Sequence, residues 1–282
     1  MTFQIIQNFD AGEYHRSEGV SSHDLGYIGH SLAYYRYKKS QPPEKKDAYD
    51  LGTLLHTAAL EPDRFEDSFI LAPECSKQGN ANKQRWAEAQ VEADRLKKIL
   101  VKKDDLQDIR LMAASVRNHP AAAAAIKSGG MVEASVYATD PETGILLRAR
   151  PDVICPGNAV VDIKTTVFGG GSEYAFGRTI GKFRYAEQAA FYQDILKLCG
   201  MEKTCFVFIV VEKEPPYAVA VYQLDDASIE AGRKQYRKDL ATYKAAVESG
   251  KWGAYSDEIQ IISAPQYKLN AANEIETTEE EE

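Results

Sequence analysis

The spacing of apolar positions changes near residue 130. Before this point apolar residues recur mostly at helical spacing, and the pattern predicts helices over residues 21–38, 49–60, 80–100, 104–118 and 119–126. Glu61-Pro62 ends the second of these helices, because proline lacks the N–H that a continuing helix needs. The first part of the chain is therefore expected to be helical.

Beyond residue 130 the apolar runs are short and rich in β-branched residues. They predict strands at 131–138, 145–155 and 159–166, and two more within 204–224. DPETG and PGN, which separate the first three strands, are typical of hairpin turns. A glycine-rich loop, VFGGGSEYAFGR, is expected to lead into a helix around residues 184–200, and residues 225–249 have the pattern of a long amphipathic helix. Helices followed by a mixed sheet that is interleaved with helices indicate an α/β or α+β fold.

These patterns favour one domain over residues 1–270. We expect a helical part at about 20–128, a sheet core that carries the chemistry at about 130–224, and a C-terminal helix and strand at 225–270. Residues 271–282 are expected to form an acidic, disordered tail. The tail is either a solubilising extension, or a mimic of DNA or a contact for a partner, and the sequence does not decide between these.

Composition narrows the class of protein. Of the 282 residues, 44% are hydrophobic, which is ample for a core, and no apolar run approaches the ~20 residues of a membrane span. The chain begins without the pattern of a signal peptide, so we expect a cytoplasmic protein. Its four cysteines show no CxxC spacing, which argues against a zinc or iron–sulfur site. The net charge of −8 does not exclude a nucleic-acid partner, because the last nine residues alone hold six glutamates.

Two aspartates on the predicted strands are expected to face each other. If Pro156-Gly157-Asn158 forms a three-residue loop, Cys155 pairs with Ala159, and Asp152 then lies opposite Asp162. Lys164 is two positions beyond Asp162 and therefore lies on the same face of the strand. Two facing carboxylates repel each other unless a cation lies between them.

The preceding hairpin adds a third carboxylate. With its turn centred near Glu142, Glu133 lies opposite Pro151, beside Asp152 and Arg150. Carboxylate oxygens grouped in this way suit Mg²⁺ or Mn²⁺, and a nearby lysine is a candidate for activating or orienting a water. The plainer alternative is a solvated hairpin with surface charges.

These residues also resemble a known family. Asp152 followed by Asp162-Ile163-Lys164 is similar to the P-D…(D/E)-x-K core of the PDDEXK nuclease superfamily. Gly52-Thr53-Leu54-Leu55-His56, Glu133 and Gln188-Ala-Ala-Phe-Tyr192 resemble the GxxxH, first-strand glutamate and QxxxY motifs of its RecB-type branch. Residues 18–270 as a whole resemble the exonuclease VIII (RecE) nuclease domain of prophages, for example in LGTLLHTAALEPDRF and HPAAAAAIKSGGMVEASVY. The implied fold is a PDDEXK core, a central mixed sheet flanked by helices.

The resemblance implies a metal centre. Asp152 and Asp162 would bind catalytic Mg²⁺, for which Mn²⁺ may substitute, together with the backbone carbonyl of Ile163. His56 would be a further ligand, and Glu133 would serve a second metal or a metal-bound water. Taken alone, a single histidine among Leu and Ala on a helix is more often a buried core residue.

The resemblance also implies roles for three residues beside the metal. Lys164 would position and help to deprotonate the attacking water, or stabilise the charge that develops on the phosphate. Gln188 and Tyr192 lie at i and i+4 on one helix face and would line the site. Without the other motifs, an ordinary amphipathic helix would explain that spacing equally well.

DNA must reach this acidic site past basic residues. Candidates for DNA contacts are Arg148, Arg150, Arg178, Lys182 and Arg184, with Phe183 and Tyr185 between the last of them. Alternating basic and aromatic side chains suit phosphate neutralisation and stacking on an unpaired end. A solvated loop is the alternative. Gly169 to Gly171 are expected to give mobility, and no nucleotide-binding fingerprint is present.

The activity that the resemblance implies is a metal-dependent exonuclease on linear double-stranded DNA. It would digest the 5′-ended strand to mononucleotides and leave a 3′ overhang for DNA recombination by a single-strand annealing protein of the RecT type. Such exonucleases form homo-oligomeric rings, and residues 225–249 and the early helices are where we expect subunit contacts.

Other readings of the motifs stay open. Another RecB-type nuclease, such as a single-strand exonuclease or an endonuclease, would keep the same core, although no cysteine cluster, Walker motif or recognition domain is present. A DNA-end-binding scaffold without catalysis is disfavoured because every motif position is filled, and a metal hydrolase acting on another substrate because there is no HExxH.

Overall fold

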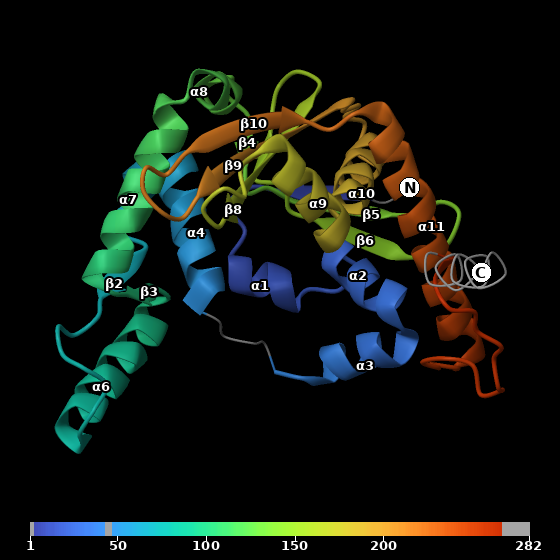
Figure 1. The fold of residues 1–282 in the computed structure, drawn as a ribbon, viewed down its shortest axis with the longest axis horizontal. Coiled ribbons are helices and arrows are strands. Elements are labelled where there is room, and N and C mark those ends of the chain that lie inside the picture. The colour runs from blue at the N-terminus through green and yellow to red at the C-terminus, as the bar shows by residue number, and fades with distance from the viewer. Residues whose placement is uncertain (1–2, 43–46, 267–282) are drawn as a thin grey trace, which may run out of the picture.

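A mixed five-stranded sheet forms the centre of the protein in the computed structural model, which describes residues 3–42 and 47–266. The strands lie in the order β10–β9–β8–β7–β4, and only β8 and β9 run parallel (Figure 1). Their bounds are β4 Met131–Val132, β7 Val153–Ile154, β8 Ala159–Thr166, β9 Cys205–Glu212 and β10 Val219–Gln223.

Helices cover both faces of this sheet. Val160 of β8 faces a core built with α2 (Ser22–His30), α10 (Tyr185–Leu198) and α11 (Asp226–Ser249). Its neighbour Val161 faces the opposite core, built with α4 (Asp47–Leu60), α7 (Lys103–Asn118) and α8 (Pro120–Lys127). Side chains alternate along a strand, so Val160 and Val161 make β8 apolar on both faces. Asp162 and Lys164 lie on the same face as Val160 and interrupt its apolar packing.

A second, three-stranded sheet continues from the first. Its order is β1–β5–β6, with β1 Phe3–Ile6, β5 Ser135–Thr139 and β6 Leu146–Ala149. One pair of chain segments runs through both sheets, since β4 leads into β5 at Glu133 and β6 leads into β7 at Arg150-Pro151-Asp152. The three candidate carboxylates therefore lie at or beside the junction of the two sheets.

Several predicted elements are confirmed and others differ. Helices α7, α8, α10 and α11 lie where they were expected. The expected helix 21–38 is broken at Ser31, whose side chain caps α3 (Leu32–Ser40) by accepting from the N–H of Tyr34. The expected loop from Val167 to Arg178 is wrong in its second half, because α9 (Glu173–Phe183) begins there.

Short elements escaped the sequence pattern. They include β1, α1 (Ala11–Arg16), α5 (Pro62–Phe65), β2 (Phe69–Leu71) and β3 (Ile99–Val101). The strands β2 and β3 pair in parallel, with β2 before α6 (Asn80–Leu96) and β3 after it. They are too short for a period to show. Residues 250–266 contain no strand, contrary to expectation, and the predicted acidic tail lies outside the described residues.

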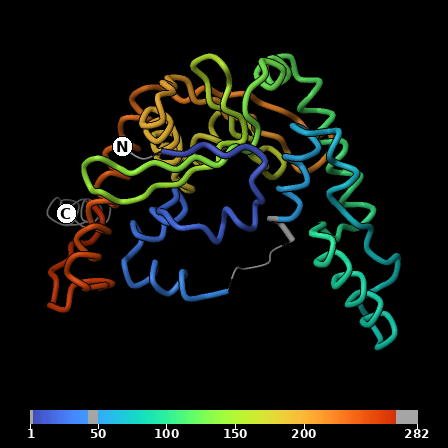
Figure 2. The backbone as a smooth tube through the Cα atoms, turned by 180° about the vertical axis from the view of Figure 1, so that it is seen from behind, coloured from blue at the N-terminus to red at the C-terminus, as the bar shows by residue number. Residues whose placement is uncertain are grey.

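The arrangement is an arch in projection. Figures 1 and 2 show α6 at one end, the C-terminal end of α11 at the other, and α1 to α3 on the inner side. The mixed α+β architecture predicted from the sequence is therefore confirmed. Within residues 3–42 and 47–266, no helix combines the length and the apolar character needed to cross a membrane.

Candidate active site

The hairpin of β7 and β8 has the register that the sequence predicted. Val153 pairs with Val161, and the N–H of Cys155 donates to the carbonyl of Ala159 at 3.1 Å. The same register, continued by one residue, places Asp152 opposite Asp162. Both aspartates are buried.

Glu133 lies opposite Asp152, so the predicted partner Pro151 was wrong by one residue. The N–H of Glu133 donates to the carbonyl of Asp152 at 3.0 Å. The turn is centred later than we expected, because the N–H of Asp140 donates to the carbonyl of Ile145 and closes a four-residue loop. Glu133 has a φ of +49°, a left-handed conformation that is uncommon for a glutamate and is often found at functional sites.

Because β7 begins only at Val153, part of β8 is left free to build the site. Before Val153, none of the described residues forms a strand that pairs with β8 on that side, and the N–H of Ile163 donates to Asp152 Oδ2 at 2.5 Å instead. The carbonyl of Ile163 lies 3.2 Å from His56 Nε2 of α4. A gap in the strand ladder thus brings a helix on one face of the sheet into contact with a carboxylate on the other.

His56, Glu133 and Asp152 form the first half of the site. His56 Nδ1 lies 3.4 Å from Glu133 Oε1 and 3.3 Å from Asp152 Oδ1. One ligand atom from each of the three residues lies within 4.8 Å of the others. Arg150 Nε donates to Glu133 Oε2 at 2.8 Å and so fixes this carboxylate. The spacing is suited to one shared cation.

The electrostatics of this half make His56 a cation. Although burial opposes the charged form, Asp152 and Glu133 raise the pKa of His56 well above its ordinary value. Burial also opposes the charge of Asp152, but the His56 imidazolium, Lys164 and the Ile163 N–H together lower the pKa of this carboxyl. Positive charge facing Asp152 and Glu133 is therefore favoured.

Lys164, Asp162, Gln188 and Tyr192 form the second half. Lys164 Nζ lies 2.6 Å from Asp162 Oδ2 in an ion pair without hydrogen-bond geometry. The Gln188 side chain accepts from Lys164 Nζ at 3.1 Å, and its Nε2 lies 3.1 Å from Asp162 Oδ1 and 3.2 Å from the Tyr192 hydroxyl. The i, i+4 pair on α10 thus contacts the charged residues of β8, and Gln188 ties the lysine to the aspartate.

Burial dominates the titration of this half. Burial, together with the charge of Asp152, raises the pKa of Asp162 to about 6 in spite of Lys164. Burial disfavours the Lys164 ammonium, but Asp162 and the groups around it outweigh this effect and raise the pKa of Lys164. Lys164 is therefore protonated at neutral pH, and Asp162 is a carboxylate whose charge the protein disfavours.

The residues present fit a divalent cation. Two carboxylates and a backbone carbonyl converge in the first half beside the His56 imidazole, and these oxygen donors suit Mg²⁺ and Mn²⁺. Asp162 Oδ2 adds a buried oxygen that accepts no hydrogen bond. An additional positive charge would offset the carboxylates that crowd this junction.

Comparison with known proteins gives the family. The model of the family described as PDDEXK-like domain of unknown function (DUF3799) matches residues 29–265, a range that includes every candidate site residue from His56 to Tyr192. The chain belongs to this family. Membership supports a hydrolytic nuclease of the PDDEXK type, and such nucleases generally depend on a divalent metal ion.

One solved structure supports the fold. A protein from Eubacterium rectale described as a "putative exonuclease" aligns with a TM-score of 0.59 at 13% identity, over 94% of this chain and 97% of its own. SSO0001 aligns with a TM-score of 0.26 at 15% identity, over 77% of this chain and 84% of its own, and carries no argument. No curated protein matches the chain.

The predicted DNA-contacting residues of this PDDEXK protein divide into two groups. Arg148 is only 5% exposed; its guanidinium donates to the carbonyl of Tyr14 and lies 3.7 Å from Asp24. Arg150 holds Glu133, and Arg184 binds Asp239. These three arginines stabilise the protein itself.

Arg178 and Lys182 form the second group. Both are exposed on α9, one helical turn apart. Lys182 Nζ lies 5.2 Å from the centroid of the Phe183 ring, and Arg178 lies 5.9 Å from that of Tyr174. These two cations keep the exposure that a phosphate contact needs.

Two residues beside the site were missed by the sequence analysis. Buried Glu212, at the end of β9, accepts from the N–H of Gly171 at 3.2 Å and so anchors the glycine loop. Partial desolvation, and then the charge of Lys164, lower the pKa of His23 on α2, so a neutral imidazole lies near the site. Neither residue belongs to a sequence motif, and only the fold brings them close to β8.

The geometry of the loop at residues 169–171 requires glycine at two positions. Gly169 has a φ of +74°, and a Cβ at Gly170 would lie 2.1 Å from the hydroxyl oxygen of Thr166. A side chain at Gly170 would therefore collide with the end of β8.

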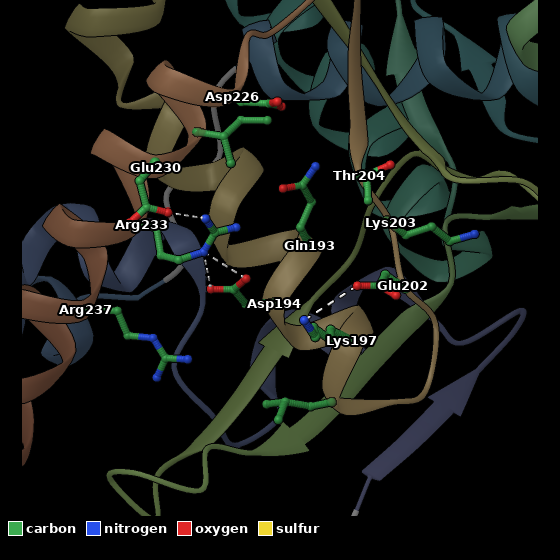
Figure 3. Close-up of a pocket in the computed structure, with 12 residues that line it drawn as sticks. Gln193, Asp194, Lys197, Glu202, Lys203, Thr204, Asp226, Glu230, Arg233 and Arg237 are labelled. Atoms are coloured by element: carbon green, nitrogen blue, oxygen red, sulfur yellow. Dashed lines mark hydrogen bonds and ion pairs between the residues drawn. The ribbon is translucent and has the colours of Figure 1, made fainter.

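A cavity of about 720 Å³ lies on another face of α10 (Figure 3). Its cations all have partners. Arg233 binds Asp194 and Glu230, and Lys197 lies 3.6 Å from Glu202. The cavity therefore contains paired charges rather than an excess of one sign.

Proposed function

We propose that this protein is a divalent-metal-dependent exonuclease that degrades linear double-stranded DNA in the 5′-to-3′ direction. It would release mononucleotides and leave 3′ single-stranded overhangs. The observation that carries the proposal is the cluster in which the ligand atoms of half-buried His56 and Glu133 and of buried Asp152 converge, with Lys164 on the facing strand of the β7–β8 hairpin. The similarity of residues 18–270 to RecE-type nucleases of the RecB-type branch supports the substrate and the polarity.

The metal-binding residues follow from the two halves of the site. His56, Asp152 and the carbonyl of Ile163 would hold Mg²⁺ or Mn²⁺ together with Asp162, and Glu133 would hold a second ion or a water. When bound, the metal supplies Lewis-acid polarisation of the phosphodiester and lowers the pKa of a water. His56 must lose its proton to act as a ligand, so metal binding releases a proton from the site.

Lys164 acts as a cation in this proposal. Because its pKa is raised, the ammonium stabilises negative charge on the attacked phosphate rather than removing a proton from water. Gln188 holds Lys164 and Asp162 in one orientation, and the Tyr192 hydroxyl in turn contacts Gln188. These two residues position the reacting groups.

The wider role rests on the family resemblance. We propose that the 3′ overhang is passed to a single-strand annealing protein of the RecT type for DNA recombination, as in prophages. We also propose that the protein works in the cytoplasm as a homo-oligomeric ring around DNA.

The test uses linear duplex DNA labelled separately at each 5′ and 3′ end, beside a closed circular duplex. With Mg²⁺ we expect loss of the 5′ label as mononucleotide while the 3′-ended strand and the circle stay intact, and no loss with EDTA. Lys164→Ala should abolish the reaction, which excludes a contaminating nuclease. Cutting of the circle would instead show an endonuclease, and an intact duplex under every divalent metal would leave a DNA-end-binding scaffold.

A further inference from the structure

Two stacked aromatic rings with a lysine at each end form a row that leads from the surface of the protein to Lys164. Lys182 Nζ lies 5.2 Å from the centroid of the Phe183 ring. The Phe183 and Tyr185 rings stack with their centroids 5.8 Å apart and their planes 24° apart. Lys164 Nζ then lies 4.5 Å from the Tyr185 ring. Only two rings therefore separate an exposed lysine from the catalytic one.

The turn between α9 and α10 builds this row. Arg184 has a φ of +60°, and this left-handed residue lets the chain turn between Phe183, which ends α9, and Tyr185, which begins α10. Its guanidinium donates to the carbonyl of Leu25 at 3.2 Å and binds Asp239, so the turn is fixed to both α2 and α11. The stacked rings are thus held in place.

The two rings differ in their surroundings. Tyr185 packs beside Phe176 and Phe208 in the core, with ring centroids 6.2 and 5.7 Å away. Phe183, in contrast, is 55% exposed. An exposed aromatic ring fixed on a half-buried ring offers a flat apolar face at little conformational cost.

The exposed face of α9 carries positive charge toward this ring. Tyr174, Arg178 and Lys182 recur every four residues and therefore lie along one side of the helix. All three are exposed. A strand of nucleic acid following this side would meet two cations for its phosphates before its bases reach Phe183.

We propose that Phe183 and Lys182 form a stacking platform for unpaired nucleotides of the strand that enters the site. Inside a duplex each base stacks on both neighbours, so beyond the terminal base pair an aromatic side chain reaches the face of a base only when the strand is unpaired. The inference rests on the proposed function and deepens it: the nucleotides beside the scissile bond are held single-stranded, and the preferred end is frayed rather than blunt.

The test measures binding without catalysis. In EDTA, a short single strand carrying 2-aminopurine near its 5′ end is titrated with the wild type, Phe183→Leu, Phe183→Trp and Tyr37→Ala. We expect Phe183→Leu to weaken binding about tenfold and to remove the quenching of 2-aminopurine that stacking causes, because one base–aromatic contact is lost. Phe183→Trp should keep both. Tyr37 is a matched control, since it is 57% exposed on α3.

A second measurement separates the platform from the nuclease activity. With Mg²⁺, Phe183→Leu should slow digestion of a blunt duplex more than that of a duplex with a frayed 5′ end, while thermal unfolding shows that the variant is folded. Equal binding and quenching by wild type and Phe183→Leu would overturn the platform even if DNA is degraded. If DNA is not degraded but the quenching depends on Phe183, the proposed function fails and the platform stands.

Discussion

Helix α10 separates two sets of charges that are balanced in different ways. On one face, Gln188 and Tyr192 contact a site where three carboxylates crowd around Lys164, His56 and Arg150. On another, Asp194 lies at a cavity where it pairs with Arg233, which also binds Glu230 (Figure 3).

The contrast teaches what each set is for. Paired charges with complete hydrogen bonds specify how elements pack, and breaking one pair costs stability. Crowded like charges lower the stability of the metal-free protein and are retained where a substrate or a metal ion needs them. Changes at the crowded site should therefore alter activity, and changes at the paired site should alter folding.

Lys164→Ala should give the largest effect. Removing the cation that faces the attacked phosphate should lower the rate of DNA cleavage by at least about 10²-fold, because such groups act mainly on the transition state. Single-turnover digestion of an end-labelled duplex measures this. The control variant Lys197→Ala, on α10 and with a side chain that is 70% exposed, should cleave at the wild-type rate. A Lys164→Ala rate within threefold of wild type would remove the lysine from the mechanism.

Asp194→Ala should act on stability instead. Asp194 accepts from Arg233 Nε at 3.0 Å and from the hydroxyl of the fully buried Tyr236, so its loss leaves a buried donor without a partner. We expect the free energy of unfolding to fall by about 2–3 kcal/mol, with the cleavage rate per folded molecule unchanged. Urea unfolding in EDTA checks the first part and active-site titration the second.

A double variant tests the cause. Adding Tyr236→Phe to Asp194→Ala removes the unpartnered hydroxyl, so part of the lost stability should return. If Tyr236→Phe lowers stability further by its full single-variant amount, the two groups are not coupled, and the paired character of this face would be in doubt.

Asp162→Asn should raise stability while removing activity. The folded protein raises the pKa of Asp162 from the ordinary value of 3.8 to about 6, so ionisation of this residue lowers stability as the pH rises between these values. Asn carries no charge, and the variant should be more stable than wild type by about 3 kcal/mol above pH 7 and equal to it near pH 4. Urea unfolding in EDTA across this pH range measures the difference. A gain that does not vary with pH would point to packing rather than to charge.

Local patterns predicted the site better than they predicted its surroundings. The register of Asp152 and Asp162 followed from one turn, because residues in a hairpin share a single short-range constraint. Glu133 was misplaced by one position because the longer turn at residues 141–144 could be centred in two ways. The contact of His56 with Ile163 depends on the late start of β7 at Val153, which no local pattern encodes.

The arginines show why charge alone is a poor guide. The local sequence does not distinguish Arg148 and Arg184, which form ion pairs, from the exposed Arg178. Their partners, Asp24 and Asp239, are more than fifty residues away in the chain. A basic residue is free for DNA only when the fold leaves it no carboxylate, and that depends on long-range packing. Similarly, β2 and β3 form a parallel pair that neither strand predicts alone.

The smallest effect is expected from the double variant Arg178→Gln, Lys182→Gln. These side chains are exposed, so their replacement should leave thermal unfolding unchanged, and DNA affinity in EDTA should fall only a few-fold at physiological salt. The more decisive quantity is the slope of log affinity against log salt, which should become shallower by about 1 to 2 because one or two phosphate contacts are lost. Arg184→Gln is the comparison: it removes the contacts with Asp239 and Leu25, and should lower stability through the α9–α10 turn. An unchanged salt slope for the double variant, or a changed slope for Arg184→Gln in its folded state, would mean that exposure on α9 does not mark the path of the DNA.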